Sequence, residues 1–205
     1  MSLEARSLTF RYPRRGKGPV LEHVNLTLEP GERVGLTAPS GRGKTTLCKL
    51  LAGYERPTAG EILLDSLPLS QYRGACPVQM IWQHPETVLD PLLPLEVSLK
   101  EAGPVEERLL EELHIQPQWL RRYPQELSGG ELQRFSIARA LGQRTEILLA
   151  DEITAMLDLI TQRQIWSALL KETQSRGISL VAVSHSQELL EKICSRILHL
   201  SAISG

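Results

Sequence analysis

The sequence predicts an α/β fold with a mainly parallel sheet, an antiparallel β part near the N-terminus and an inserted helical lobe. Two continuous apolar runs, at 147–150 and 180–183, are separated by a stretch with helical spacing. Such runs are typical of parallel strands that helices cover on both faces. The first third alternates apolar and polar residues instead, as half-buried antiparallel strands do. Residues 83–125 hold six prolines around one charged helix, and this change of character indicates an insertion.

The N-terminal part is expected to run from strands into a helix. Apolar residues alternate over positions 8–12 and again over 24–28, with a basic, glycine-rich loop at 13–19 between them. A turn then leads into a further strand at 33–36. Apolar residues recur at helical spacing over 44–52, and a glycine follows at the position that a helix C-cap favours.

Helix and strand patterns alternate again towards the C-terminus. Long stretches with apolar residues at helical spacing end at a glycine, which predicts helices, while short continuous apolar runs predict strands. The expected elements are a short charged helix at 105–113 in the insertion, helices at 130–141 and about 157–176, strands at 147–150, 178–183 and 197–200, and a short helix before the last strand.

The length suits a single domain. A domain averages roughly 150 residues, so the 205 residues leave room for one core and an added lobe. At this length about 70% of the surface of the unfolded chain can be buried without help from disulfides or metals. We therefore expect one domain over 1–205, in which residues 1–82 and 128–205 form the core and about 83–127 form the helical lobe.

Composition excludes several classes of protein. Lys and Arg number 23 against 24 Asp and Glu, so the net charge of −1 predicts no nucleic-acid partner. The longest apolar runs have four residues, far short of the roughly 20 that cross a bilayer. The first six residues carry two charges and no apolar stretch follows them, so no secretory signal is expected. Three widely spaced cysteines suit a reducing compartment, and we expect a cytosolic protein.

A phosphate-binding loop is predicted at the turn between the strand at 33–36 and the helix at 44–52. The turn reads Ala-Pro-Ser-Gly-Arg-Gly-Lys-Thr-Thr over 38–46. Backbone N–H groups at such a turn cradle phosphate oxygens, the lysine reaches the outer phosphates, and the first threonine hydroxyl binds Mg²⁺. This predicts a P-loop NTPase core, although the strict pattern has glycine where this chain has Ala38. The residues expected to hold the nucleotide are Ser40, Gly41, Arg42, Gly43, Lys44, Thr45 and Thr46.

Two carboxylates follow a buried strand. Asp151 and Glu152 come directly after the apolar run at 147–150. Open α/β sheets bind their ligands at the carboxyl ends of the strands, so both side chains are expected at the site. Asp151 suits the Mg²⁺ shell, directly or through water. Glu152 suits the role of the general base that polarises the attacking water.

A third motif narrows the class of protein. Residues 127–131 read Leu-Ser-Gly-Gly-Glu just before an amphipathic helix, where Ser128 can cap the helix and the glycines leave its first N–H groups open to an anion. With the phosphate loop 83 residues earlier and the carboxylates 24 residues later, the sequence resembles the ATP-binding subunit of ABC transporters. The resemblance covers nearly the whole chain and implies the ABC ATPase fold.

The resemblance implies a role for further residues. Tyr12 resembles the aromatic residue that stacks on adenine, with Phe10 as a rival. Gln83 resembles the glutamine that touches Mg²⁺ and water and reports on the membrane partner, and His185 resembles the histidine that contacts the γ-phosphate. The implied catalytic residues are Glu152, His185 and Gln83, the implied Mg²⁺ ligands are Thr45, Gln83 and Asp151, and the cofactors are ATP and Mg²⁺.

The resemblance also implies a dimer. ATP would be clamped between the phosphate loop of one subunit and Ser128 and Gly130 of the other, so that the γ-phosphate lies between two helix N-termini. The Leu157-Asp158 pair resembles the loop through which two such subunits touch. The second ATPase subunit is a second copy or a sibling chain, so homodimer and heterodimer both remain open.

Within the family, the sequence is similar to the peptide/nickel importer group. The stretch 79–85 with Leu-Asp-Pro at 89–91, and the residues flanking the 127–131 motif, match that group. The implied function is an ATPase that energises import of peptide, nickel or a metal chelate. The implied partners are transmembrane permeases and, indirectly, a solute-binding protein, with the chain peripheral on the cytoplasmic face of the cell membrane. Trp82 and the apolar stretch 89–99 are expected to help form the groove for a permease helix.

Other functions stay open at this stage. A soluble ABC-type ATPase of DNA repair, chromosome organisation or translation is one, although its usual second cassette, zinc insertion or coiled coil has no room here. A GTPase or small-molecule kinase is opposed by the 127–131 motif and by the lack of an Asn-Lys-x-Asp motif, since Asn25 is the only asparagine. A partner subunit that binds ATP but hydrolyses it weakly is the third, because Ala38 and Ile153 depart from the family pattern.

Overall fold

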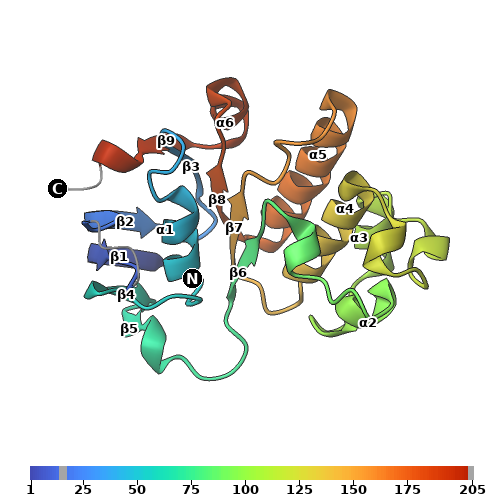
Figure 1. Cartoon of the computed structure of the whole chain (residues 1–205), viewed down its shortest axis with the longest axis horizontal. Coiled ribbons are helices and arrows are strands. Elements are labelled where there is room, and N and C mark those ends of the chain that lie inside the picture. Colours follow the sequence, from blue (N-terminus) through green and yellow to red (C-terminus); the bar gives the residue numbers. More distant parts are fainter. Residues whose placement is uncertain (14–17, 203–205) are drawn as a thin grey trace.

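The computed structural model describes residues 1–13 and 18–202, and Figure 1 shows them arranged in layers. An antiparallel sheet lies at one side, helix α1 (Lys44–Leu51) separates it from a parallel sheet, and the remaining long helices cover the other face of that sheet. The predicted combination of a parallel sheet with a separate antiparallel part is confirmed.

The antiparallel sheet is built by the N-terminal strands, in the order β2-β1-β4-β5. Their bounds are β1 Leu3–Phe10, β2 Leu21–Leu28, β4 Ala59–Leu64 and β5 Leu67–Pro68. Buried and exposed residues alternate over 24–28 of β2, as the sequence predicts. The prediction that the first strand reaches position 12 is wrong, because β1 ends at Phe10 and Tyr12 lies beyond it. Part of the expected loop at 13–19 lies outside the described residues.

The parallel sheet has the order β6-β7-β8-β3-β9, and each neighbouring pair is parallel. Its strands are β6 Val78–Ile81, β7 Ile147–Asp151, β8 Ser179–Val183, β3 Arg33–Thr37 and β9 Arg196–His199. All residues of β7 and β8 are buried, as their continuous apolar runs predict. The carboxyl ends of β6, β7, β8 and β3 therefore lie side by side at one edge of the sheet.

The long helices begin where capping residues allow. Helix α4 (Gly129–Ala140) starts after Ser128, whose hydroxyl accepts from the Glu131 N–H, so the predicted cap is confirmed. Helix α5 (Leu159–Arg176) starts two residues later than predicted because the Asp158 carboxylate accepts from the Ile160 and Thr161 N–H groups. It ends at Gly177, which has the left-handed φ of 66°. Helix α6 (Gln187–Ile193) precedes β9.

The proline-rich region contains two short helices rather than the one predicted. They are α2 (Leu95–Lys100) and α3 (Glu107–Glu112), the second of which falls inside the predicted 105–113. The stretch 89–99 is expected from the sequence to help form the permease groove as a whole, but only part of it can. Leu89, Leu95 and Leu99 are buried in the core and are not available to a partner. The division into a core and a lobe at 83–127 stays a prediction. The 3₁₀ turns of the chain are Leu69–Gln71, Pro85–Thr87, Pro117–Trp119, Pro124–Glu126 and Leu200–Ala202.

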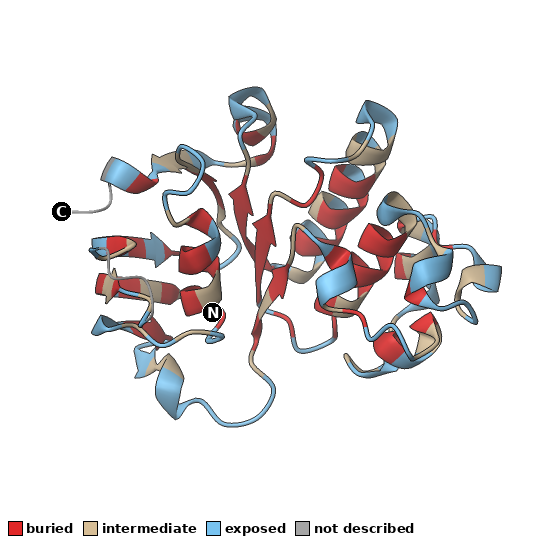
Figure 2. Ribbon diagram, viewed as in Figure 1, coloured by how far each residue is buried: buried red, intermediate tan, exposed pale blue. Residues whose placement is uncertain are grey.

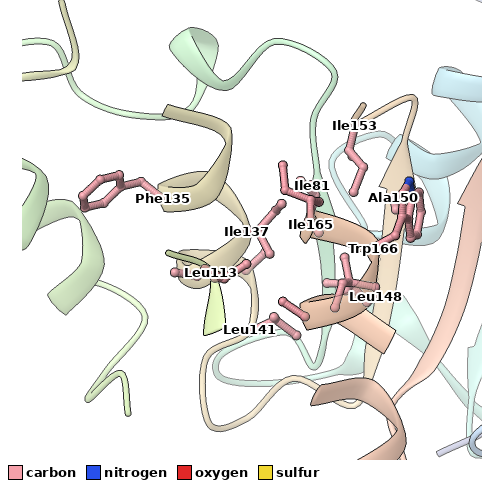
Figure 3. Close-up of a cluster of buried hydrophobic side chains, with 14 of the residues drawn as sticks. Ile81, Leu113, Phe135, Ile137, Leu141, Leu148, Ala150, Ile153, Ile165 and Trp166 are labelled. Carbon is pink, nitrogen blue, oxygen red and sulfur yellow. The ribbon is translucent and has the colours of Figure 1, made fainter. Parts of the chain in front are cut away.

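Two apolar cores flank the parallel sheet, as the burial pattern in Figure 2 shows. One joins the antiparallel sheet, α1 and one face of the parallel sheet. The other joins the opposite face to α4, α5 and the short helices, with Phe135, Ile137 and Leu148 fully buried (Figure 3). Among the described residues, no helix has the length and apolar character needed to span a membrane.

Candidate functional site

The loop between β3 and α1 has the geometry of a phosphate cradle. Gly41 and Gly43 adopt left-handed φ values of 75° and 92°, which turn the chain sharply into the helix. Lys44 is 5% exposed, and its Nζ donates to the Ala38 carbonyl at 2.8 Å. Ala38 itself is not among the described residues with positive φ, so its methyl group brings no backbone strain to this loop.

Three charged or titratable side chains meet beside this loop. Glu152 Oε1 lies 2.9 Å from His185 Nε2 and 3.5 Å from Lys44 Nζ, and the last two atoms are 3.5 Å apart. Glu152 and His185 follow β7 and β8, and Lys44 begins the helix α1 that the loop after β3 leads into; the strand order makes these three strands neighbours. A hydrogen bond between His185 and Glu152 requires a hydrogen on Nε2, because a carboxylate only accepts. The structure thus brings together the predicted base, histidine and lysine.

The backbone of Glu152 is unusual. Its φ is 51°, in the left-handed region that residues with a Cβ rarely adopt. The Glu152 N–H donates to the Val183 carbonyl at 3.1 Å, which continues the pairing of β7 with β8 past the end of the strand. Such strain costs of order 1–3 kcal/mol and clusters at functional sites. It turns the carboxylate towards Lys44 and His185.

Asp151 has the features of a cation ligand. It is 2% exposed, and its Oδ1 has no hydrogen-bond partner among the described residues. Burial raises the pKa of Asp151, with a smaller contribution from Glu152, while the Thr45 hydroxyl and the Lys44 charge act in the opposite direction. A buried acceptor without a donor costs free energy unless a donor or cation reaches it. The residues therefore fit Mg²⁺, which prefers carboxylate and hydroxyl oxygens.

The predicted residues around the phosphate loop line one open hollow of about 1290 Å³. Tyr12 contributes its ring, and its hydroxyl lies 3.3 Å from Thr46 Oγ1, whereas Phe10 is buried in the core and is 4% exposed. The position of Tyr12 at the hollow therefore favours it over Phe10, and its contact with adenine stays a prediction. The lining comprises Tyr12, Val20, Ser40, Gly41, Gly43, Lys44, Thr45, Thr46, Gln83, Glu152 and His185. Arg42 is exposed in the same loop but does not line the hollow.

Ser128 and Gly130 lie elsewhere. They line a separate hollow of about 920 Å³, together with Met156, Leu157 and Asp158. Glu131 holds Ser128 through its hydroxyl at 2.7 Å and its N–H at 2.8 Å, and these bonds lower the pKa of the Glu131 carboxyl. One chain alone therefore does not bring the 127–131 motif to the phosphate loop.

Two contributors were not predicted from the sequence. Val20 lines the hollow from the position just before β2, and its only signal is that it follows a glycine-rich loop. Gln133 on α4 donates from Nε2 to the Trp82 carbonyl at 3.3 Å and so fixes the segment that leads to Gln83. No residue type or spacing in the sequence marks this last contact.

Comparison with known proteins identifies the family. The family described as ABC transporter matches residues 21–155. The chain is 35% identical over 209 residues to the nickel import system ATP-binding protein NikE of Staphylococcus aureus strain bovine RF122 / ET3-1, covering 96% of this chain and 85% of the relative. The chain belongs to the ABC transporter ATPases. NikE of S. aureus strain MRSA252 is 34% identical to this ABC ATPase with the same coverage.

Solved structures agree with this family. The ABC ATPase matches an ATP-binding cassette in a dimeric, post-hydrolysis state bound to ADP and Pi with a TM-score of 0.83 and 26% identity, covering 96% of this chain and 93% of that one. A dimeric bacterial ABC transporter cassette gives a TM-score of 0.82 at 27% identity, with the same coverage. The ABC ATPase fold and the resemblance to the nickel importer group are confirmed. As a member of this family, the ABC ATPase binds and hydrolyses ATP.

Proposed function

We propose that this ABC ATPase energises the import of nickel, a nickel or other metal chelate, or a peptide. The observation that carries the proposal is the meeting of Lys44, Glu152 and His185 at the carboxyl edge of the parallel sheet, in a chain 35% identical to a nickel import ATPase. In this proposal, the free energy of ATP hydrolysis drives transport across the membrane.

The side chains of the hollow divide the chemistry. The backbone N–H groups of the loop and Lys44 hold the phosphates, and Tyr12 stacks on the adenine. Glu152 Oε1 accepts a proton from the attacking water as the water oxygen bonds to the γ-phosphorus. The bond from that phosphorus to the bridging oxygen breaks, and the products are ADP and phosphate. His185 contacts the γ-phosphate and orients Glu152.

Mg²⁺ would be held by Thr45, Asp151 and Gln83. When bound, the ion neutralises charge on the phosphate oxygens. The unpartnered Oδ1 of Asp151 supports this assignment. Gln83 follows β6, next to β7 in the sheet, and lines the same hollow.

A second ATPase subunit would complete the site. Ser128 and Gly130 line a different hollow from Lys44, so a partner's copy of this motif would close over the nucleotide. The two solved dimeric structures, both of the same cassette, support this arrangement. The partner is a second copy or a sibling chain with the same motifs.

A permease is proposed to dock between the core and the helical lobe of residues 83–127. A groove of about 760 Å³ runs along the edge strand β6, lined among others by Tyr54, Trp82, Val88 and Arg139. Near it in sequence, the Leu92 side chain is 80% exposed. An amphipathic helix binds such a mixed apolar and polar groove. The chain would then lie on the cytoplasmic face of the membrane, and a solute-binding protein would act on it only through the permease.

The test is co-expression of the chain with candidate nickel or peptide permeases and their solute-binding protein. We expect the chain to co-purify with detergent-solubilised permeases, and vesicles to take up radioactive nickel or labelled peptide with ATP. A Lys44→Ala variant serves as the control, because it keeps the groove but loses the phosphate contact. A chain that never binds the permeases, or uptake that is equal with Lys44→Ala, contradicts the proposal.

A further inference from the structure

We propose that Gln162 and Trp166, on the first turns of α5, are positioning residues for hydrolysis. They hold the loop of residues 153–158, here called the linking loop, which joins Glu152 to α5. The inference rests on the proposed role of Glu152. Neither residue touches the hollow that contains Lys44, so neither is a catalytic residue.

Gln162 is hydrogen-bonded to both ends of the linking loop. Its Nε2 donates to the Thr154 carbonyl and to the Leu157 carbonyl, each at 2.9 Å. Carbonyl oxygens only accept, so both protons of one amide group are needed to satisfy them. The side chain thus closes the turn that the Leu157 N–H begins by donating to the Thr154 carbonyl at 3.2 Å.

Trp166 holds the same loop from its buried side. Its Nε1 donates to the Thr154 hydroxyl at 3.1 Å, and the ring is 4% exposed. Ile153, 3% exposed, lies in the same buried cluster, as Figure 3 shows. The loop sequence Ile-Thr-Ala-Met-Leu-Asp has no proline, so its backbone is not stiffened by the chain itself. The two side chains of α5 supply the order instead.

The linking loop has a functional group at each end. At its start, Glu152 is held 2.9 Å from His185. Near its end, Leu157 lies against Gly130, since a Cβ built on Gly130 would be 3.4 Å from Leu157 Cδ2. The loop therefore connects the candidate base of one ATP site to the motif that would complete the other site. The position of the loop therefore influences both Glu152 and the contact with the 127–131 motif.

Space exists for the loop to move if these bonds are lost. A small hollow lies between the linking loop and the start of α6, lined by Ile153, Thr154, Gln162, Trp166, Val183 and Leu189 among others. A loop freed from Gln162 could relax into it and take Glu152 with it. A displacement of about 1 Å at a reacting group can lower a rate about 100-fold.

The experiment compares substitutions that change only the donors. Gln162→Glu keeps the shape but places a carboxylate against two carbonyl oxygens, and we expect kcat for ATP hydrolysis to fall about 10- to 100-fold with nucleotide Kd within about twofold. Gln162→Arg still offers N–H donors to the two carbonyls, and we expect this variant to retain most of the wild-type kcat. Gln174→Glu, the same change at an exposed position of α5, is the matched control and leaves kcat unchanged.

Trp166→Phe provides an independent test, because it keeps an aromatic side chain, although a smaller one, and removes the N–H donor to the Thr154 hydroxyl. We expect kcat to fall about 3- to 10-fold, in line with the loss of one hydrogen bond. The inference would be overturned by a wild-type kcat in Gln162→Glu or by a kcat in Gln162→Arg as low as in Gln162→Glu. A loss of nucleotide affinity as large as the loss of kcat would also overturn it.

Amide hydrogen exchange separates this inference from the proposed function. The Ala155 and Leu157 N–H groups donate within the turn at 3.1 and 3.2 Å. We expect Gln162→Glu to speed exchange at both, and Gln174→Glu to leave it unchanged. Unchanged exchange refutes the positioning role whatever the activity. Faster exchange in Gln162→Glu, together with a wild-type chain that hydrolyses no ATP, would leave the positioning role in place and remove the catalytic role from Glu152.

Discussion

Two glycines of the phosphate loop allow a quantitative test of its backbone. Gly41 and Gly43 have φ values of 75° and 92°, so alanine at either position meets the same unfavourable backbone region. Their surroundings differ. A Cβ at Gly43 would lie 2.8 Å from Leu21 Cδ2, whereas no described atom outside its chain neighbours comes within 4 Å of a Cβ at Gly41.

The magnitude follows from these two terms. A left-handed backbone costs a residue with a Cβ about 1–2 kcal/mol. Leu21 is buried at 3% exposure and cannot turn away freely, so Gly43→Ala adds an overpacking cost of about 1–3 kcal/mol. Gly43→Ala is then expected to lose about 1–3 kcal/mol more than Gly41→Ala.

Thermal unfolding and nucleotide binding measure this difference together. If the fold absorbs the strain, Tm falls about 2–12 °C further for Gly43→Ala, at about 2–4 °C per kcal/mol. If the loop moves away from Leu21, the strain appears as a nucleotide Kd about 5- to 150-fold weaker, since 1.4 kcal/mol is tenfold. Equal Tm and equal Kd for the two variants would refute the packing of β2 against this loop.

Three further substitutions or modifications test other parts of the molecule. Glu152→Gln should lower kcat about 10²–10⁴-fold, the range for loss of a general base, while ATP-bound dimers accumulate in gel filtration. Leu92→Glu, at a side chain 80% exposed, should change the free energy of unfolding by less than about 0.5 kcal/mol yet weaken permease co-purification. Burial raises the pKa of the Cys194 thiol to about 11 from an ordinary 9.0, so alkylation at neutral pH should be about 100-fold slower than for a free thiol. Because the folded thiol holds its proton more tightly, its contribution to stability is complete below pH 9.0 and declines as pH rises towards 11. Rapid labelling of Cys194 in the folded chain at neutral pH would contradict the raised pKa of its thiol.

The success of the sequence-based prediction depended on how strongly each segment signals itself. Strands β7 and β8 are buried throughout, so their continuous apolar runs could be recognised without a structure. Strand β4 was missed because its first half is exposed and its apolar part is only Ile62, Leu63 and Leu64. Helix α2 was missed because six residues between prolines and glycine show little periodicity.

The site residues were predictable because their chemistry sits at strand ends. Lys44, Glu152 and His185 follow strands that are neighbours in the sheet, and the sequence motifs marked each one. The hydrogen bonds of Gln162 could not be predicted, because they join a side chain to backbone carbonyls that any sequence possesses, and the bond from Trp166 to the Thr154 hydroxyl has no spacing signal of its own. The left-handed φ of Glu152 was equally hidden, since nothing about glutamate favours it.

The placement of Lys44 and Ser128 in separate hollows has a genetic consequence. Damage to one position leaves the other intact on the same molecule. In the proposed dimer, a pair with Lys44 substituted in one copy and Ser128 substituted in the other would have both defects in one ATP site and none in the other site. Two inactive alleles could then complement each other, whereas neither allele alone would give an active transporter.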